Sequence, residues 1–136
     1  MGINISFYSF HENKIINSKG KIEANKSFSE ITYFGKRFYP ICNYFEKKYN
    51  YNQDGTDFFE ISPEEMKEFL ETVKRQELMD KKELKNWKKT FGDNDNYKNK
   101  SDEEIKKFFH DEIIEGIKEV EEEAAENKNV YFRYYY

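Results

Sequence analysis

The chain has 136 residues, 23 basic and 27 acidic side chains, a net charge of −4, and 37% hydrophobic residues. This length predicts one domain, residues 1–136, with a core of about two packed layers. The negative charge argues against binding to duplex DNA, which attracts basic surfaces. No apolar run is long enough to cross a membrane, the start lacks a signal-peptide pattern, and Cys42 is the single cysteine. We therefore expect a cytoplasmic protein without membrane association or disulfides.

Aromatic residues dominate the apolar set, with 13 Phe, 11 Tyr and 1 Trp against only three leucines. Aromatic rings bury large areas and stack on flat or apolar partners. Tyrosines beyond the needs of a small core indicate a recognition surface. The abundance of Lys, Asn, Ile, Phe and Tyr is also typical of AT-rich coding, so both explanations stay open.

The first half of the chain predicts strands and then a helix. Residues 3–10 alternate between apolar and polar, as in a half-buried strand. Residues 14–24 have a turn signal at their centre and predict a hairpin, and 29–34 predict a further short strand. Apolar residues at helical spacing over 38–49 predict a helix, with Pro40 in its first turn.

The second half of the chain is mainly helical, and its helix starts are marked by cap residues. Ser62 with Glu65, and Ser101 with Glu104, form capping boxes, while Asp80 with Glu83 is a further cap pair. The predicted elements are a strand at 57–61, helices at 63–76, from about 80, and at 102–126, and a terminal strand at 130–136. Together they predict an α+β fold, with a small antiparallel sheet that includes the N- and C-terminal strands and is covered by three to four helices.

Three blocks resemble a family of small uncharacterised proteins encoded by bacteriophages and prophages. The blocks are ITYFGKRFYPICNYF (Ile31 to Phe45), DFFEISPEEMKEFLETVKR (Asp57 to Arg75) and HDEIIEGIKEVEEEAAENKNVYFRYYY (from His110). The first is similar to the family's Ile-x-Tyr-Trp-Arg-Lys type segment, with Phe34 in the Trp position and one extra residue. The resemblance implies a phage accessory origin and an α+β fold, and it transfers no catalytic residue.

No residue pattern in the chain predicts catalysis, a metal site or a cofactor. His11 and His110 have no second ligand at metal-binding spacing, and we expect His110 to be a half-exposed helix residue. Residues 93–104 have the spacing of an EF-hand loop, but Tyr97 takes a ligand position and the required glycine is missing. Cys42 lies on the apolar stripe of its helix, which favours packing over nucleophilic chemistry. We therefore predict a protein that is not an enzyme.

The first candidate binding surface is the helix at 102–126, which carries eleven acidic and three basic residues. Glu115, Glu119, Glu122 and Glu126 fall on one side of this helix at i, i+4, i+7 and i+11. Such a row is usually a solvated face. The alternative is that its carboxylates occupy a basic site on a protein that normally holds nucleic acid.

The second candidate is the segment containing Tyr33, Lys36, Arg37 and Tyr39. Its two cations would hold phosphates at a helix start while a tyrosine ring stacks on a base. A loop with solvated cations and buried rings explains the same residues. Arg133 and Tyr135 carry a similar ambiguity, because cation–π packing on a strand explains them without a ligand.

These observations lead to three functional hypotheses. The leading one is a non-catalytic counter-defence inhibitor that blocks a host immune protein, such as a CRISPR effector, through its acidic helix and exposed tyrosines. The alternative is a sponge that sequesters a nucleotide immune signal through the Lys36–Arg37 segment. A second alternative is a structural or interaction protein of a phage with no counter-defence role. Each would act in the host cytoplasm, and self-association is compatible with all three.

Overall fold

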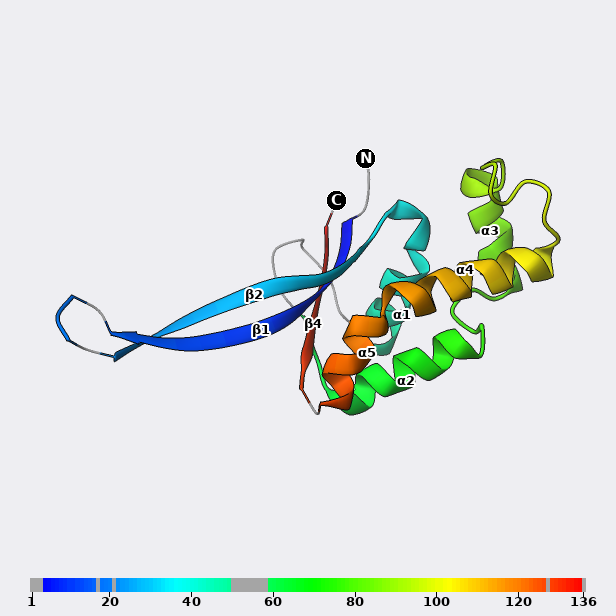
Figure 1. The fold of residues 1–136 in the computed structure, drawn as a ribbon. Helices are drawn as coiled ribbons and strands as arrows, with labels where there is room; N and C mark the ends of the chain where they lie inside the picture. Colours follow the sequence, from blue (N-terminus) through cyan, green and yellow to red (C-terminus); the bar gives the residue numbers. More distant parts are fainter. Residues whose placement is uncertain (1–3, 17, 21, 50–58, 127, 136) are drawn as a thin grey trace.

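The molecule combines a helical body with a long β-hairpin that projects from it (Figure 1). The computed structural model describes residues 4–16, 18–20, 22–49, 59–126 and 128–135, while the side chains of residues 11–16, 22–27, 49 and 135 lie outside the description. The hairpin consists of β1 (Asn4–Ile16) and β2 (Ile22–Phe34). Its inner half belongs to the main sheet, and its outer half extends away from the helices.

The sheet has four antiparallel strands in the order β2-β1-β4-β3. The short β3 (Phe59–Ile61) lies at one edge, and β4 (Val130–Tyr135) lies between β3 and β1. Phe132 of β4 is opposite both Phe7 and Phe59. The strands closest to the two ends of the chain are therefore neighbours in the middle of the sheet, which confirms the predicted α+β arrangement.

Helices cover one face of the sheet (Figure 1). A single 3-10 turn, η1 (Lys36–Phe38), follows β2, and five α-helices follow among the described residues: α1 (Pro40–Tyr49), α2 (Pro63–Lys74), α3 (Lys81–Phe91), α4 (Asp102–Gly116) and α5 (Lys118–Ala125). Pro40 lies in the first turn of α1, as predicted, although α1 begins at Pro40 and not at Phe38. None of the described helices combines the length and apolarity that a membrane span requires.

The core lies between the covered sheet face and the helices, and aromatic rings fill its centre. Phe7 and Phe132 from the sheet and Phe45 from α1 have no exposed surface. The Phe45 ring centroid lies 4.6 Å from that of Phe132 and 4.9 Å from that of Phe69 on α2. These interlocked rings explain how a chain with three leucines still builds a dense core.

The hairpin is longer than predicted, because it joins the predicted hairpin at 14–24 to the strands predicted at 3–10 and 29–34. Backbone pairing runs without interruption from Ile5 opposite Phe34 to Ile16 opposite Ile22, with one register shift that leaves Ile31 as the extra residue of β2. The predicted hairpin at 14–24 is confirmed, since the strands turn between Ile16 and Ile22. The predicted separation from 3–10 and 29–34 was wrong, because it relied on alternating apolar residues, whereas backbone pairing carries the strands through polar stretches.

The single helix predicted at 102–126 is divided in the structure into α4 and α5, with Ile117 between them. Ile117 has φ −106° and ψ 15°; its amide donates to the Ile113 carbonyl and its carbonyl accepts from the Glu121 amide. A Cβ on Gly116 would lie 2.8 Å from the ring of Phe34. The helix therefore breaks beside a close approach to β2, a contact between distant residues that periodicity does not encode.

The predicted helix caps are confirmed. The side chains of Ser62 and Ser101 accept from the amides of Glu65 and Glu104, and both capping boxes are closed by the glutamate side chains. Asp80 likewise accepts from the Glu83 amide at the start of α3. These local hydrogen bonds satisfy amides that each helix start leaves unpaired.

Candidate binding surface

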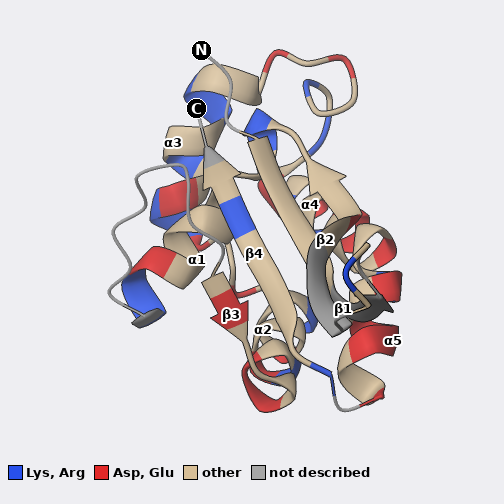
Figure 2. Ribbon diagram, turned by 90° about the vertical axis from the view of Figure 1, so that its left-hand side faces the viewer, with Lys and Arg blue, Asp and Glu red and all other residues tan. Residues whose placement is uncertain are grey.

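The clearest concentration of charge is an acidic groove between α5 and β2. Its volume is about 290 Å³, and it is lined by Ser9, Glu30, Ile31, Glu119, Glu122, Glu123 and Glu126. We call these seven residues the acidic groove. Every charged side chain that lines it is a carboxylate. Figure 2 shows the acidic residues along α5, at the opposite end of the helical layer from the basic residues of α3.

Local geometry explains how these carboxylates come together. Four of them recur at helical spacing along and just beyond α5, so they share one side of that helix. Glu30 comes from β2 beside the bulged Ile31, and it accepts a hydrogen bond from the Ser6 hydroxyl at 3.3 Å. The groove therefore joins charges that are almost ninety residues apart in the sequence.

The ion pairs of this region leave much of that charge unbalanced. Glu126 pairs with Lys128 at 2.7 Å, and outside the groove Glu121 pairs with Lys74 at 3.3 Å. Within the described part of the chain, no ion pair is formed by Glu119 or Glu122. Adjacent carboxylates repel one another, so a cation from outside would relieve this repulsion.

The structure separates one of the four glutamates predicted as one row from the others. Glu119, Glu122 and Glu126 line the acidic groove, but Glu115 belongs to α4 and pairs with Lys118 at 3.0 Å. The helix break at Ile117 lies between them. Glu123 was missed although it lies four residues after Glu119, and Glu30 was missed because no local signal links β2 to α5.

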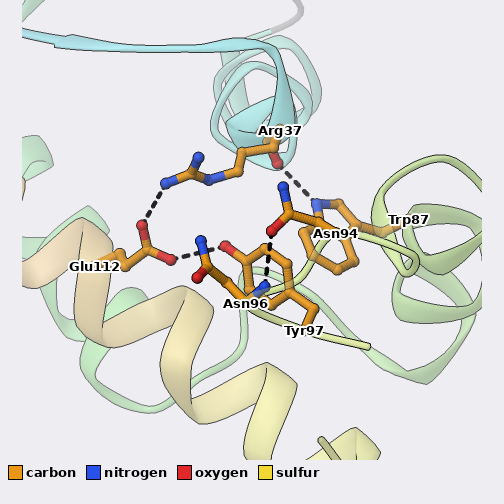
Figure 3. Close-up of polar contacts among 6 residues, drawn as sticks. All are labelled: Arg37, Trp87, Asn94, Asn96, Tyr97 and Glu112. Carbon is orange, nitrogen blue, oxygen red and sulfur yellow. Dashed lines mark hydrogen bonds and ion pairs between the residues drawn. The ribbon is translucent and has the colours of Figure 1, made fainter. Parts of the chain in front are cut away.

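Arg37 of the second candidate segment is held by an internal polar network (Figure 3). Its Nη2 donates to Glu112 Oε2 at 2.5 Å, and the Tyr97 hydroxyl donates to Glu112 Oε1 at 2.7 Å. The Arg37 carbonyl accepts from Trp87 Nε1 at 2.8 Å. Burial, together with the neighbouring Glu112 carboxylate, raises the pKa of Tyr97. The network joins η1, α3 and α4, so Arg37 has a structural role.

The side chains of Tyr33, Lys36 and Tyr39, the other residues of this candidate segment, lie in different environments. Lys36 is exposed, and Tyr33 is 52% exposed with its hydroxyl donating to Asn4 Oδ1. Tyr39 is partly buried, with its ring 6.4 Å from that of Phe91, and burial raises its pKa. The segment therefore does not bring its two cations and two rings to one place.

Tyr33 instead shares a row of the sheet with Arg133. Both residues lie opposite Ser6, one on β2 and the other on β4. Ser6 lies between the core residues Ile5 and Phe7 on β1, so its row belongs to the opposite face of the sheet. The backbone of Tyr135 pairs with Asn4, and its side chain lies outside the described residues.

Cys42 and His110 are both buried. Burial raises the pKa of the Cys42 thiol, which keeps it in the unreactive protonated form. His110 has no exposed surface, contrary to the half-exposed position predicted; its Nε2 accepts from the Leu78 amide and its Nδ1 lies 2.6 Å from the Lys106 carbonyl. The described residues contain no group of His, Cys, Asp or Glu side chains suited to a metal ion.

A larger groove of about 570 Å³ lies between α3 and α4, but its charges are mixed. It is lined by four lysines, three carboxylates and Leu84, and Lys88 pairs with Asp102 at 2.7 Å. The acidic groove is smaller but uniform in charge.

No protein-family model, curated protein or solved structure matches this chain.

Proposed function

We propose that this protein acts by binding a basic surface of a partner protein through the acidic groove. The observation that carries the proposal is the convergence of Glu30 with Glu119, Glu122, Glu123 and Glu126 around one groove. Unlike charges attract across such an interface and speed its formation. Because phosphates carry the same sign as these carboxylates, the groove favours a protein partner over a nucleotide.

The proposed partner is a protein that holds nucleic acid. Such proteins bind the phosphate backbone with clustered Lys and Arg side chains, and an acidic groove would compete for those same cations. The resemblance to phage-encoded proteins makes a host defence protein, such as a CRISPR effector, the first partner to test. The protein would then act without catalysis, in the host cytoplasm, by occupying a surface needed for nucleic acid.

The two other hypotheses receive less support from the described residues. A nucleotide sponge would need Arg37 to leave Glu112, with which it forms a 2.5 Å ion pair. A phage interaction protein without a counter-defence role would use the same acidic groove but bind a partner unrelated to host defence. The identity of the bound partner therefore separates these alternatives.

The test is binding to purified CRISPR effectors, each with and without its nucleic acid. We expect immobilised protein to bind at least one effector at about 0.1 M salt, and to lose it as salt rises toward about 0.5 M. Target nucleic acid should compete with the protein. Glu119→Lys with Glu122→Lys should reduce binding at least tenfold, because two attractive charges become repulsive.

The matched control is Asp93→Lys with Asp95→Lys, which changes the net charge equally on an exposed loop away from the groove. It should bind like the unmodified protein. Equal binding by the groove variant would reject the acidic groove as the interface. Release of a nucleotide from heat-denatured protein, detected by absorbance and mass, would instead support the sponge.

A further inference from the structure

Three aromatic rings pack together on the sheet beside the acidic groove. Phe10 of β1, Phe28 of β2 and Tyr131 of β4 have ring centroids 5.2 to 5.8 Å apart. Phe28 is 39% exposed, and the other two are partly exposed. We call these residues the aromatic triad. Its rings retain exposed surface, so they remain accessible to a partner.

The aromatic triad is joined to the acidic groove through one shared residue. A second groove, of about 360 Å³, is lined by Phe10, Glu123, Lys128, Asn129 and Tyr131. Glu123 lines both grooves. A partner segment lying along α5 would therefore contact carboxylates first and aromatic rings next. We call this second hollow the ring groove.

We propose that the ring groove is a subsite for an arginine side chain of the partner bound in the acidic groove. This inference rests on the proposed function and specifies its chemistry. A guanidinium is planar and weakly hydrated, so it stacks on a ring while it donates to a carboxylate. A lysine ammonium is compact and strongly hydrated, and it gains less from the same surroundings. Charge alone would not distinguish the two, whereas the combination of rings and Glu123 does.

A lysine of the chain itself already lies at this place. The ammonium of Lys128 is 2.7 Å from Glu126, and this carboxylate, with Glu123 adding a smaller effect, raises the pKa of Lys128. The groove thus attracts a cation within the same molecule. An arriving arginine would compete with Lys128, so removing this ammonium should strengthen binding of the partner.

The experiment uses two fluorescent peptides of equal length, one of alternating Arg and Gly and the other of alternating Lys and Gly. Anisotropy titrations of the full chain should show a preference of about fivefold for the arginine peptide. Tyr131→Leu should abolish the preference while retaining the affinity for the lysine peptide, and Tyr131→Phe should keep it. Lys128→Met should raise the affinity for both peptides severalfold.

Phe108→Leu is the control, because Phe108 is an exposed ring of α4 that lines neither groove. It should leave the preference intact. If Tyr131→Leu unfolds, as seen by circular dichroism, Phe10→Leu takes its place. Equal affinity of the unmodified protein for both peptides, or a preference that survives loss of the ring, would overturn the arginine subsite. Failure to bind either peptide would overturn the acidic groove itself.

Discussion

At the residue scale, His110 makes the stability of the fold depend on pH. Its Nε2 accepts from the Leu78 amide, so its Nδ1 carries the proton and donates to the Lys106 carbonyl. Protonation of Nε2 would replace this acceptor by an N–H group facing the Leu78 N–H, so the hydrogen bond would be lost. Burial lowers the pKa of His110, with nearby Lys106 lowering it further and the Lys106 carbonyl and Asp111 opposing this.

The sign of this effect follows from proton binding. The pKa of His110 is lower in the folded protein than in the unfolded chain, where it is about 6.5. Between these two pKa values the unfolded chain therefore binds more protons than the folded protein. The contribution of His110 is fully present above that pH and is lost as the pH falls below it. We expect chemical denaturation of His110→Gln to show a weaker loss of stability between about pH 7.5 and pH 5 than the unmodified protein. Parallel pH profiles for the two proteins would contradict this role.

At the element scale, α4 approaches the sheet closely where Gly116 lies against the ring of Phe34 on β2. Alanine favours helices over glycine by about 1 kcal/mol, so local propensity predicts that Gly116→Ala stabilises the protein. The packing predicts the opposite, since the new Cβ would lie 2.8 Å from the buried Phe34 ring. We expect a net destabilisation of about 1–3 kcal/mol, as for other overpacked cores.

A double-mutant cycle measures this contact. Phe34→Leu removes the ring that the alanine would meet, so the two substitutions together should cost less than the sum of their separate effects. Unfolding in urea of the four proteins gives this coupling. Additive effects would show that the methyl group added by Gly116→Ala does not meet the Phe34 ring.

The same contact shows how far sequence patterns predict this fold. Helix starts were predictable, because Ser62, Asp80 and Ser101 act on amides within three residues. The continuous hairpin and the break at Ile117 were not, because they depend on partners distant in sequence. The acidic face of α5 was also predictable, because its glutamates lie at helical spacing within one short segment. The contribution of Glu30 to the groove was not predictable, because it depends on the packing of α5 beside β2.

At the scale of the whole molecule, the position of β4 makes the last residues essential to the fold. β4 lies between β1 and β3, and β3 pairs with no other strand among the described residues. Val130 and Phe132 have no exposed surface, and Tyr134 is 2% exposed. Burial of each such side chain contributes about 1.5–3 kcal/mol, against a typical total stability of about 5–15 kcal/mol.

Deletion of residues 130–136 should therefore unfold the protein rather than only shorten its sheet. The remaining β1 would expose an unpaired edge and its apolar residues, which favours aggregation. Circular dichroism and size-exclusion chromatography should show loss of the folded monomer, whereas deletion of Tyr136 alone should preserve cooperative unfolding.

In the intact protein, the amides of β4 should exchange hydrogen as slowly as those of β1, because both strands open only with the central sheet. A cooperatively folded truncated chain, or fast exchange in β4, would show that this strand is not part of the stable core.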